Sequence, residues 1–183
     1  LRNLKADEVN VISASGKELP FKTDIKPYVP KTYADVYEAI ERAKAPIVVL
    51  DDANYLMSFE EMARVQESGY GKFSQMANNF FKVFKAIMDK PGNQTFYVLS
   101  HAGETEDGHL EVKTTGKMLS EKIVLEGFTN ILLTNDITPD GEFVFKVKTD
   151  GTGVKSPIGM FEDATIPNDL KLVNEAITKY YAP

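Results

Sequence analysis

The 183-residue sequence contains no cysteine, which excludes disulfide bonds, thiolate zinc sites and thiol chemistry. We find no secretory signal and no apolar run of transmembrane length, so we expect a soluble, cytoplasmic protein with no membrane partner. The net charge of −6 argues against broad adhesion to nucleic acid, although a local basic groove remains compatible with it. An apolar content of 43% is ordinary for a globular protein, and the length predicts one domain over residues 1–183.

A complete phosphate-binding loop is also missing. Glycine–lysine pairs occur at three places, Gly16-Lys17, Gly71-Lys72 and Gly116-Lys117. None has a glycine five residues before the pair, and none of the lysines is followed by serine or threonine, as the loop pattern requires. The element that would hold phosphates on backbone N–H groups is therefore absent from these residues.

The most informative segment that is present runs from Ile47 to Asp52. Four apolar residues follow one another without a break, which predicts a strand covered on both faces, and they end in Asp51 and Asp52. Two carboxylates where such a strand emerges can hold a hydrated divalent cation, as in the Walker B element of P-loop ATPases. The alternative is an ordinary buried strand whose carboxylates cap the next turn.

In phosphoryl transfer, the first carboxylate would orient Mg²⁺ through its water shell and the second would polarise the attacking water. We assign these roles to Asp51 and Asp52, although Asp52 could instead cap the turn at Ala53-Asn54. A second buried strand, residues 95–99, ends at Ser100-His101. If the two strands are neighbours, His101 faces the same crevice and could sense the terminal phosphate. The alternative is an exposed loop histidine.

Helical periodicity is strongest in residues 73–88, where Met and Phe side chains recur at steps of three and four. Such a stripe could be a groove for a partner, but we interpret it as core, with Phe80, Phe81 and Phe84 buried. The other elements that we expect are strands at 9–12, 104–106, 109–113, 128–134 and 142–148 and helices at 33–40 (capped by Thr32), 58–67, 118–125 and a last one capped by Asn168. Turns are expected at Asp107-Gly108 and Pro139-Asp140-Gly141.

This order of elements predicts an α/β fold with a mixed sheet, parallel in front and antiparallel behind, flanked by helices. Basic residues gather in the antiparallel part, among them Lys148 and Lys155. For any single lysine, a solvated surface charge is the alternative to a ligand contact.

Several segments together resemble the bacteriophage RecA-like AAA ATPases, which are nucleotide-binding proteins of phage recombination and single-strand annealing modules. The matching segments are Leu1-Arg2-Asn3-Leu4, Ile47–Asp52 with Tyr55-Leu56-Met57, Leu99-Ser100-His101, residues 116–123, and Lys155–Phe161 leading into Ile166–Lys171. The resemblance implies a RecA-like P-loop core in which Leu-Arg-Asn-Leu lies just after the Walker A motif, so that the chain starts immediately downstream of it.

The resemblance also implies ATP and Mg²⁺ as cofactors and hydrolysis coupled to DNA recombination or annealing in a bacterial host. Asp51 would hold the metal, Asp52 and His101 would be catalytic, and Ser100, Lys148 and Lys155 would contact the nucleotide, the lysines from a neighbouring subunit. The expected partners are further copies of the chain, single-stranded DNA or phage recombination proteins. Without Walker A, residues 1–183 are expected to be inactive.

Two other classes of function compete with this interpretation. One is a non-catalytic binding module that keeps the ATPase fold and acts by protein contact in phage DNA metabolism, and the missing phosphate loop favours it. The other is a metal-dependent phosphatase or nuclease built on Asp51 and Asp52, which lacks the additional acidic and histidine ligands of a two-metal site.

Overall fold

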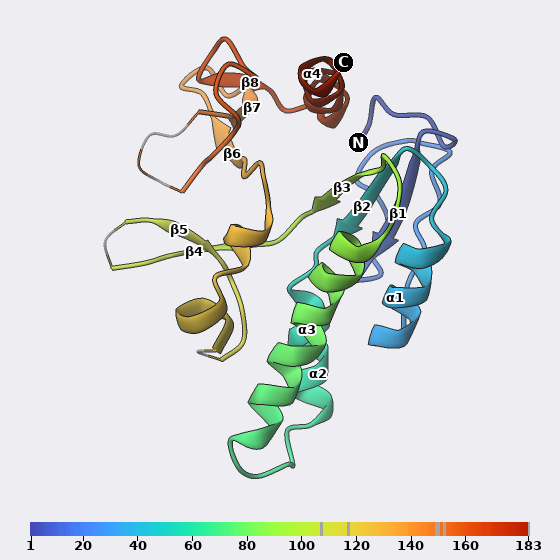
Figure 1. Ribbon diagram of the computed structural model, residues 1–183, viewed down its shortest axis with the longest axis vertical. Coiled ribbons are helices and arrows are strands. Elements are labelled where there is room, and N and C mark those ends of the chain that lie inside the picture. The colour runs from blue at the N-terminus through green and yellow to red at the C-terminus, as the bar shows by residue number, and fades with distance from the viewer. Residues whose placement is uncertain (107, 117, 149–150, 152, 183) are drawn as a thin grey trace. The chain divides into compact units, whose positions relative to one another are not determined.

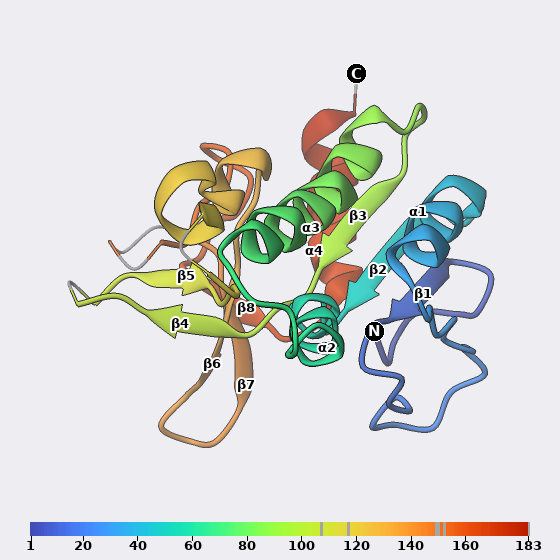
Figure 2. The ribbon, with the colours of Figure 1, turned by 90° about the horizontal axis from the view of Figure 1, so that it is seen from below.

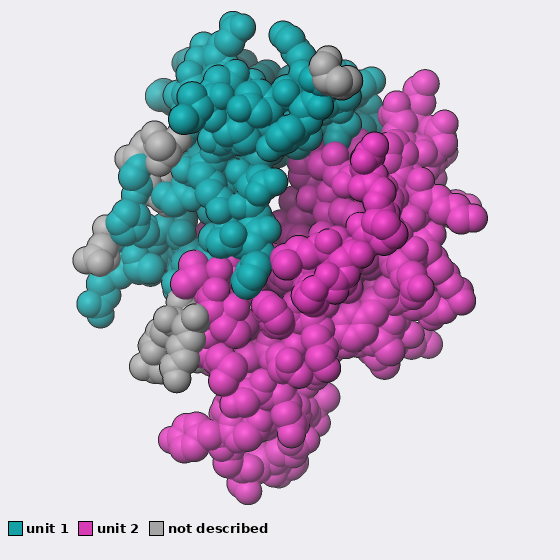
Figure 3. Space-filling view, in the orientation of Figure 1, with its two compact units in different colours: residues 1–4, 103–111, 126–183 teal, residues 5–102, 112–125 magenta. Residues whose placement is uncertain are grey.

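A computed structural model describes residues 1–106, 108–116, 118–148, 151 and 153–182. The chain divides into two compact units, which Figure 3 shows in different colours. Unit 1 comprises Leu1–Leu4, Gly103–Glu111 and Glu126–Pro183, and unit 2 comprises Lys5–Ala102 and Val112–Leu125. The organisation of residues 1–183 as one domain stays a prediction.

Unit 2 is built on a parallel sheet of three strands in the order β1-β2-β3 (Figure 2). The strands are β1 (Val9–Ser13), β2 (Ile47–Asp51) and β3 (Thr95–Val98). All four apolar residues of β2 are buried, as the unbroken run predicts. Because Ser13 pairs with Asp51 and Leu50 pairs with Val98, the carboxyl ends of the three strands meet at one edge of the sheet.

The helices α1 (Tyr33–Arg42) and α3 (Gly71–Asp89) cover the same face of this sheet (Figures 1 and 2). The start of α1 is fixed by a capping box, since the hydroxyl of Thr32 accepts from the N–H of Asp35 and the Asp35 carboxylate accepts from the N–H of Thr32. This confirms the predicted cap.

The helix α2 (Tyr55–Ala63) begins and ends earlier than the predicted range 58–67. Its N-terminal residue Asn54 makes no side-chain capping bond, so the sequence signal for its start is weak. It ends at Ala63, and the side chain of Arg64 turns back to pair with Glu60 and Glu67.

The apolar stripe of α3 forms core. Phe80 and Phe84 are buried and pack edge to face with their ring centroids 5.6 Å apart. They share one cluster with Val48 and Leu50 of β2, while Phe81 is partly buried against it. The core interpretation is confirmed for Phe80 and Phe84, and the burial fades toward the end of the helix, where Met88 is half exposed.

The segment after β3 differs from the prediction in its boundaries. The strands β4 (Ala102–Glu104) and β5 (Leu110–Val112) form a separate two-stranded sheet, and Asp107 of the expected turn lies outside the described residues. The expected short helix around 118–125 is confirmed in its position, but it is a π-helix (Met118–Ile123) that is followed by a short 3-10 helix (Leu125–Phe128). Val124, with a left-handed φ of 49°, interrupts the helical path between them.

Unit 1 contains an antiparallel sheet in the order β6-β7-β8 and the helix α4 (Leu170–Tyr181). The strands are β6 (Thr134–Ile137), β7 (Phe143–Lys146) and β8 (Thr165–Pro167). The expected strand at 128–134 is therefore wrong, because the pairing with β7 begins at Thr134 and Leu132 forms an isolated bridge with Lys155.

The α/β class and the parallel-then-antiparallel order are confirmed, but the single mixed sheet is not. The described residues form three separate sheets, β1-β2-β3, β4-β5 and β6-β7-β8. The cap of the last helix is Asp169, whose carboxylate accepts from the N–H of Lys171, and not Asn168. The Asn168 amide instead donates to the side chain of Asn135.

Candidate functional site

The carboxyl end of β2 places two acidic side chains at the edge of the parallel sheet. Asp51 is the last residue of the strand, and its carbonyl accepts from the N–H of Ala14 in the neighbouring chain segment after β1. Asp52 leaves the strand with a left-handed φ of 56°, a conformation that aspartate tolerates better than most residues.

Two basic groups approach the carboxylate of Asp52, one at each oxygen. The Lys17 Nζ lies 3.4 Å from Oδ2, and the His101 Nε2 lies 3.5 Å from Oδ1. The Asp52 side chain is only 22% exposed, whereas those of Lys17 and His101 are more than half exposed. The carboxylate therefore contacts these two side chains, and the alternative in which it caps the turn at Ala53-Asn54 stays a prediction.

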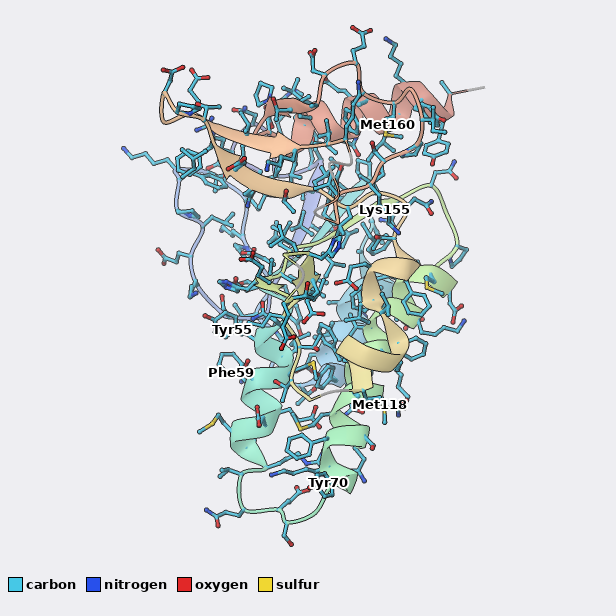
Figure 4. All side chains as sticks on the ribbon, turned by 90° about the vertical axis from the view of Figure 1, so that its left-hand side faces the viewer. Tyr55, Phe59, Tyr70, Met118, Lys155 and Met160 are labelled. Atoms are coloured by element: carbon cyan, nitrogen blue, oxygen red, sulfur yellow. The ribbon has the colours of Figure 1, made fainter. Side chains whose placement is uncertain are left out.

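Tyr55, which Figure 4 labels, lies at the N-terminal end of α2, and its ring contacts both of these basic groups. The Lys17 Nζ lies 4.9 Å from the ring centroid, within the range of a cation–π contact. His101 meets the same ring edge to face, with centroids 5.9 Å apart. The Asn54 side-chain oxygen accepts from the His101 N–H at 3.3 Å, which holds the residue after β3 beside the start of α2.

The position of Lys17 follows from the turn at the end of β1. Ser13 is fully buried, and its N–H donates to the carbonyl of Tyr28. Gly16 has a positive φ of 70° and donates its N–H to the Ser13 carbonyl, so the chain reverses there and Lys17 returns to the sheet edge. A Cβ at Gly16 would also lie 3.3 Å from the Val29 side chain.

Burial raises the pKa of Asp51, and the neighbouring Asp52 carboxylate raises it further. The backbone N–H of Asp52 and the Lys17 ammonium act in the opposite direction. The pKa of Lys17 is raised, first by its hydrogen bond with Asp52 and then by the charge of that carboxylate. Burial and the neighbouring charge thus make Asp51 harder to ionise than an ordinary aspartate.

The acidic pair fits a hard cation that keeps part of its water shell. Carboxylate oxygens suit Mg²⁺, which is commonly held by one or two carboxylates together with waters and substrate phosphates. In the described part of the chain, no group of three or more His, Cys, Asp or Glu side chains could hold a metal ion. A site made of Asp51 and Asp52 alone would therefore need oxygen ligands from a substrate.

The structure brings Ser100 and His101 to this edge, because β3 lies beside β2 in parallel. His101 is an exposed loop residue, as the alternative interpretation has it, and its Nε2 also lies 3.5 Å from Asp52 Oδ1. The Ser100 hydroxyl is buried and has no hydrogen-bond partner among the described residues.

The two predicted nucleotide-contacting lysines lie in unit 1. Lys148 Nζ donates to the carbonyl of Glu162, and Lys155 Nζ donates to that of Glu126 at 2.6 Å. Both lysines thus have structural partners within unit 1, and their action on a nucleotide of a neighbouring subunit stays a prediction.

Sequence reasoning missed Lys17 and Tyr55 as members of this edge. In the sequence, Lys17 belongs only to an incomplete phosphate-loop pattern, and Tyr55 only to a segment that resembles the phage ATPases. The separation of 35 residues between Lys17 and Asp52 leaves no local signal. Only the pairing of β1 with β2 brings the turn after β1 to the acidic pair.

A hollow of about 730 Å³ lies elsewhere in unit 2, along β1. It is lined by β1, by residues of the segment 24–28 and by the end of α1 with the loop that follows, and Asp51 and Asp52 are not among its lining residues. The candidate site is therefore an open edge of the sheet and not this hollow.

Comparisons with protein-family models, with curated proteins and with solved structures find no match to this chain. No helix in the described residues combines the length and the apolar character that crossing a membrane requires.

Proposed function

We propose that this chain is the core of a Mg²⁺-dependent ATPase of the RecA-like P-loop type. The observation that carries the proposal is the convergence of Asp51, Asp52, Ser100 and His101 at the carboxyl edge of the parallel sheet of unit 2. In open α/β sheets, this edge is where ligands bind. Two adjacent carboxylates there suit a metal-bound triphosphate better than an uncharged ligand.

Each residue has a role that its position supports. Bound Mg²⁺ would neutralise the charge that develops on the transferred phosphoryl group. Asp51, at the end of β2, holds the metal through its waters. Asp52 orients the attacking water, and His101 keeps that carboxylate in place by its contact at 3.5 Å. The unpartnered hydroxyl of Ser100 donates to a phosphate oxygen.

The biological setting in this proposal rests on the resemblance alone. We infer a phage or prophage protein that acts in the cytoplasm of a bacterial host, couples hydrolysis to DNA recombination or annealing, and assembles with copies of itself. Single-stranded DNA or phage recombination proteins would be its partners. Lys148 and Lys155 would act on the nucleotide of the neighbouring subunit.

The proposal is tested by ATP hydrolysis in a protein that carries these residues together with a phosphate loop. Asp51→Asn should leave the fold intact and lower turnover about 100-fold or more, because the metal loses the carboxylate that orients it. Asp24→Asn, which makes the same charge change at an exposed position of unit 2, should hydrolyse ATP normally. Near-normal turnover of Asp51→Asn would defeat the assignment.

A non-catalytic binding module is the second candidate, and one observation favours it. Gly16-Lys17 follows β1, but the next helix begins only at Tyr33, and Gly71-Lys72 opens α3 with no strand directly before it. Neither pair therefore has the strand–loop–helix setting of a phosphate loop. If the candidate is correct, Asp51→Asn would leave the biological activity of the protein unchanged.

A further inference from the structure

The turn between α2 and α3 presents apolar side chains to solvent. Tyr70, directly before α3, is 91% exposed, and Met62 and Val65 are also exposed. Figure 4 shows Tyr70 at the end of the α2–α3 pair, and these three residues are called the tip below. Tyrosine combines an apolar ring with a polar hydroxyl and is enriched among the residues that dominate protein interfaces. The tip therefore has the character of an interaction surface.

Arg64 fixes the conformation of the turn that carries the tip. Its guanidinium donates to Glu60 at 2.9 Å, to both carboxylate oxygens of Glu67 and to Gln75 at 2.6 Å. Because Glu60 lies on α2 and Gln75 on α3, the arginine joins the two helices across the turn. The Lys72 Nζ also donates to the Arg64 carbonyl. A surface that is ordered before it binds loses less conformational entropy on binding.

The hollow along β1, in the same unit, has apolar walls. Its volume of about 730 Å³ is in the range of ordinary ligand pockets. The lining includes Val9 and Val11 of β1 and the short side chains of Ala39 and Ala43 at the end of α1. An aromatic ring that enters this space is surrounded by apolar atoms.

The hollow also borders unpaired backbone groups of β1. One edge of β1 pairs with β2, and on the other edge its partner is Tyr28, which bonds to the backbone of Val11 and Ser13. Val9 shares the orientation of these two residues, and its backbone has no partner on that edge among the described residues, although Val9 is buried. Buried backbone groups without a partner are costly, and a tyrosine hydroxyl can both donate to them and accept from them.

The tip and the hollow lie toward different ends of the sheet of unit 2. The helix α2 starts at the carboxyl edge, where Tyr55 contacts His101, and the turn between α2 and α3 lies beyond the sheet (Figure 1). The hollow is lined by the end of α1 and residues 43–45, which lead into the amino end of β2. A projecting surface at one end and a concave surface at the other suit a head-to-tail contact between copies.

Charges of both signs accompany each surface. Glu61 and Lys72 flank the tip, and the lining of the hollow includes Asp24, Lys26 and Lys44. In the part of the chain that the structure describes, Glu61, Lys26 and Lys44 have no ion pair. Their groups are free to pair across a contact, and such pairs favour one orientation of the two partners.

We propose that the tip of one copy of this chain docks into the hollow along β1 of the next copy, with Tyr70 as the inserted side chain. Two tips or two hollows do not match each other in shape, so the contact is head-to-tail and produces a ring or a filament. This inference goes beyond the proposed function, which names no surface for self-assembly, and it depends on neither nucleotide nor metal.

Sedimentation velocity of residues 1–183 without nucleotide, from about 10 µM to about 1 mM, tests the contact. The sedimentation coefficient of the unchanged chain should rise with concentration. Tyr70→Ser should weaken the association at least about tenfold, because the inserted side chain is lost. Ile158→Ser, which removes an apolar side chain that is 96% exposed in unit 1, should associate like the unchanged chain.

A second pair of variants tests the head-to-tail geometry. Ala43→Arg places a long side chain in the hollow and should abolish association while the tip remains intact. Mixed in equal amounts, Tyr70→Ser and Ala43→Arg should form a dimer and nothing larger, since the mixture retains one intact tip and one intact hollow per pair. Ala6→Arg, at an exposed position of the same lining, replaces Ala43→Arg if that variant does not fold.

Three results would overturn the inference. They are an unchanged chain that stays monomeric throughout the range, equal association of Tyr70→Ser and Ile158→Ser, and a mixture of folded variants that stays monomeric. Thermal unfolding of each variant is the control for folding. None of these results bears on ATP hydrolysis, so the proposed function stands or fails separately.

Discussion

At the scale of single residues, the acidic edge combines two carboxylates with unequal environments. Asp51 is half-buried at the end of β2, whereas Asp52 faces Lys17 and His101. Burial raises the pKa of Asp51 and so works against its charged form, whereas Lys17 and His101 lie beside the carboxylate of Asp52. Such unequal environments suit a pair in which one carboxylate binds a cation and the other is oriented by its neighbours.

The raised pKa of Asp51 predicts that Asp51→Asn stabilises the protein at neutral pH. The folded pKa lies above the unfolded value, so ionisation of Asp51 weakens the folded state as pH rises through the folded pKa. Below the unfolded value, near pH 4, the carboxyl is protonated in both states and the gain should vanish. Thermal unfolding of both proteins between pH 8 and about pH 3 measures this.

The matched control is Asp24→Asn, which removes a charge from an exposed position. Its melting temperature should follow that of the unchanged chain throughout the pH range. A lower melting temperature for Asp51→Asn at pH 7 would show that ionised Asp51 stabilises the fold, contrary to the account.

At the scale of elements, the core of unit 2 depends on the contact of α3 with the parallel sheet. Phe84 is buried and packs against Phe80 within the cluster that includes β2. Phe84→Ala should lower the free energy of unfolding by about 3–5 kcal/mol, because it leaves a cavity that the rigid surroundings fill only in part. Denaturant unfolding measures the change.

Met88, on the same helix, is half exposed and provides the comparison. Met88→Ala should change the free energy of unfolding by less than about 1 kcal/mol, because little apolar surface is returned to water. Equal effects of the two substitutions would mean that Phe84 is not part of the core and would reopen the interpretation of the stripe as a partner groove.

Elements with strong local signals could be predicted from the sequence. The strand at Ile47–Asp51 and the helix at Gly71–Asp89 have unbroken or strongly periodic apolar patterns, and Thr32 with Asp35 forms a recognisable cap. Elements set by tertiary pairing could not. The strand β6 begins only at Thr134, where β7 lies opposite and can pair with it. The apolar residues just before Thr134 therefore indicate a strand in the sequence but do not form one with β7.

The residues of the candidate site divide in the same way, into those with a local sequence signal and those without one. Asp51, Asp52, Ser100 and His101 end apolar runs, so their strands indicate them and the parallel pairing brings them together. Lys17 and Tyr55 carry no such pattern, because a lysine beyond a turn and a tyrosine at a helix start are common. The contact of Lys17 with Asp52 exists only through the folded sheet.

At the scale of the whole molecule, the binding of a triphosphate depends on which groups of the protein contact its phosphates. The acidic edge can attract a metal ion, but two carboxylates repel phosphates unless the metal lies between them. Most of the hold on a triphosphate comes from the backbone N–H groups and the lysine of a phosphate loop. No segment of residues 1–183 has that loop pattern.

Calorimetric titration with Mg-ATP tests this central claim most directly. Residues 1–183 alone should show no micromolar binding. A protein in which a phosphate loop accompanies them should bind Mg-ATP in the micromolar range. In that protein, Asp51→Asn should make the binding of ATP independent of the metal. Micromolar binding by residues 1–183 alone, or metal dependence unaffected by Asp51→Asn, would contradict the account.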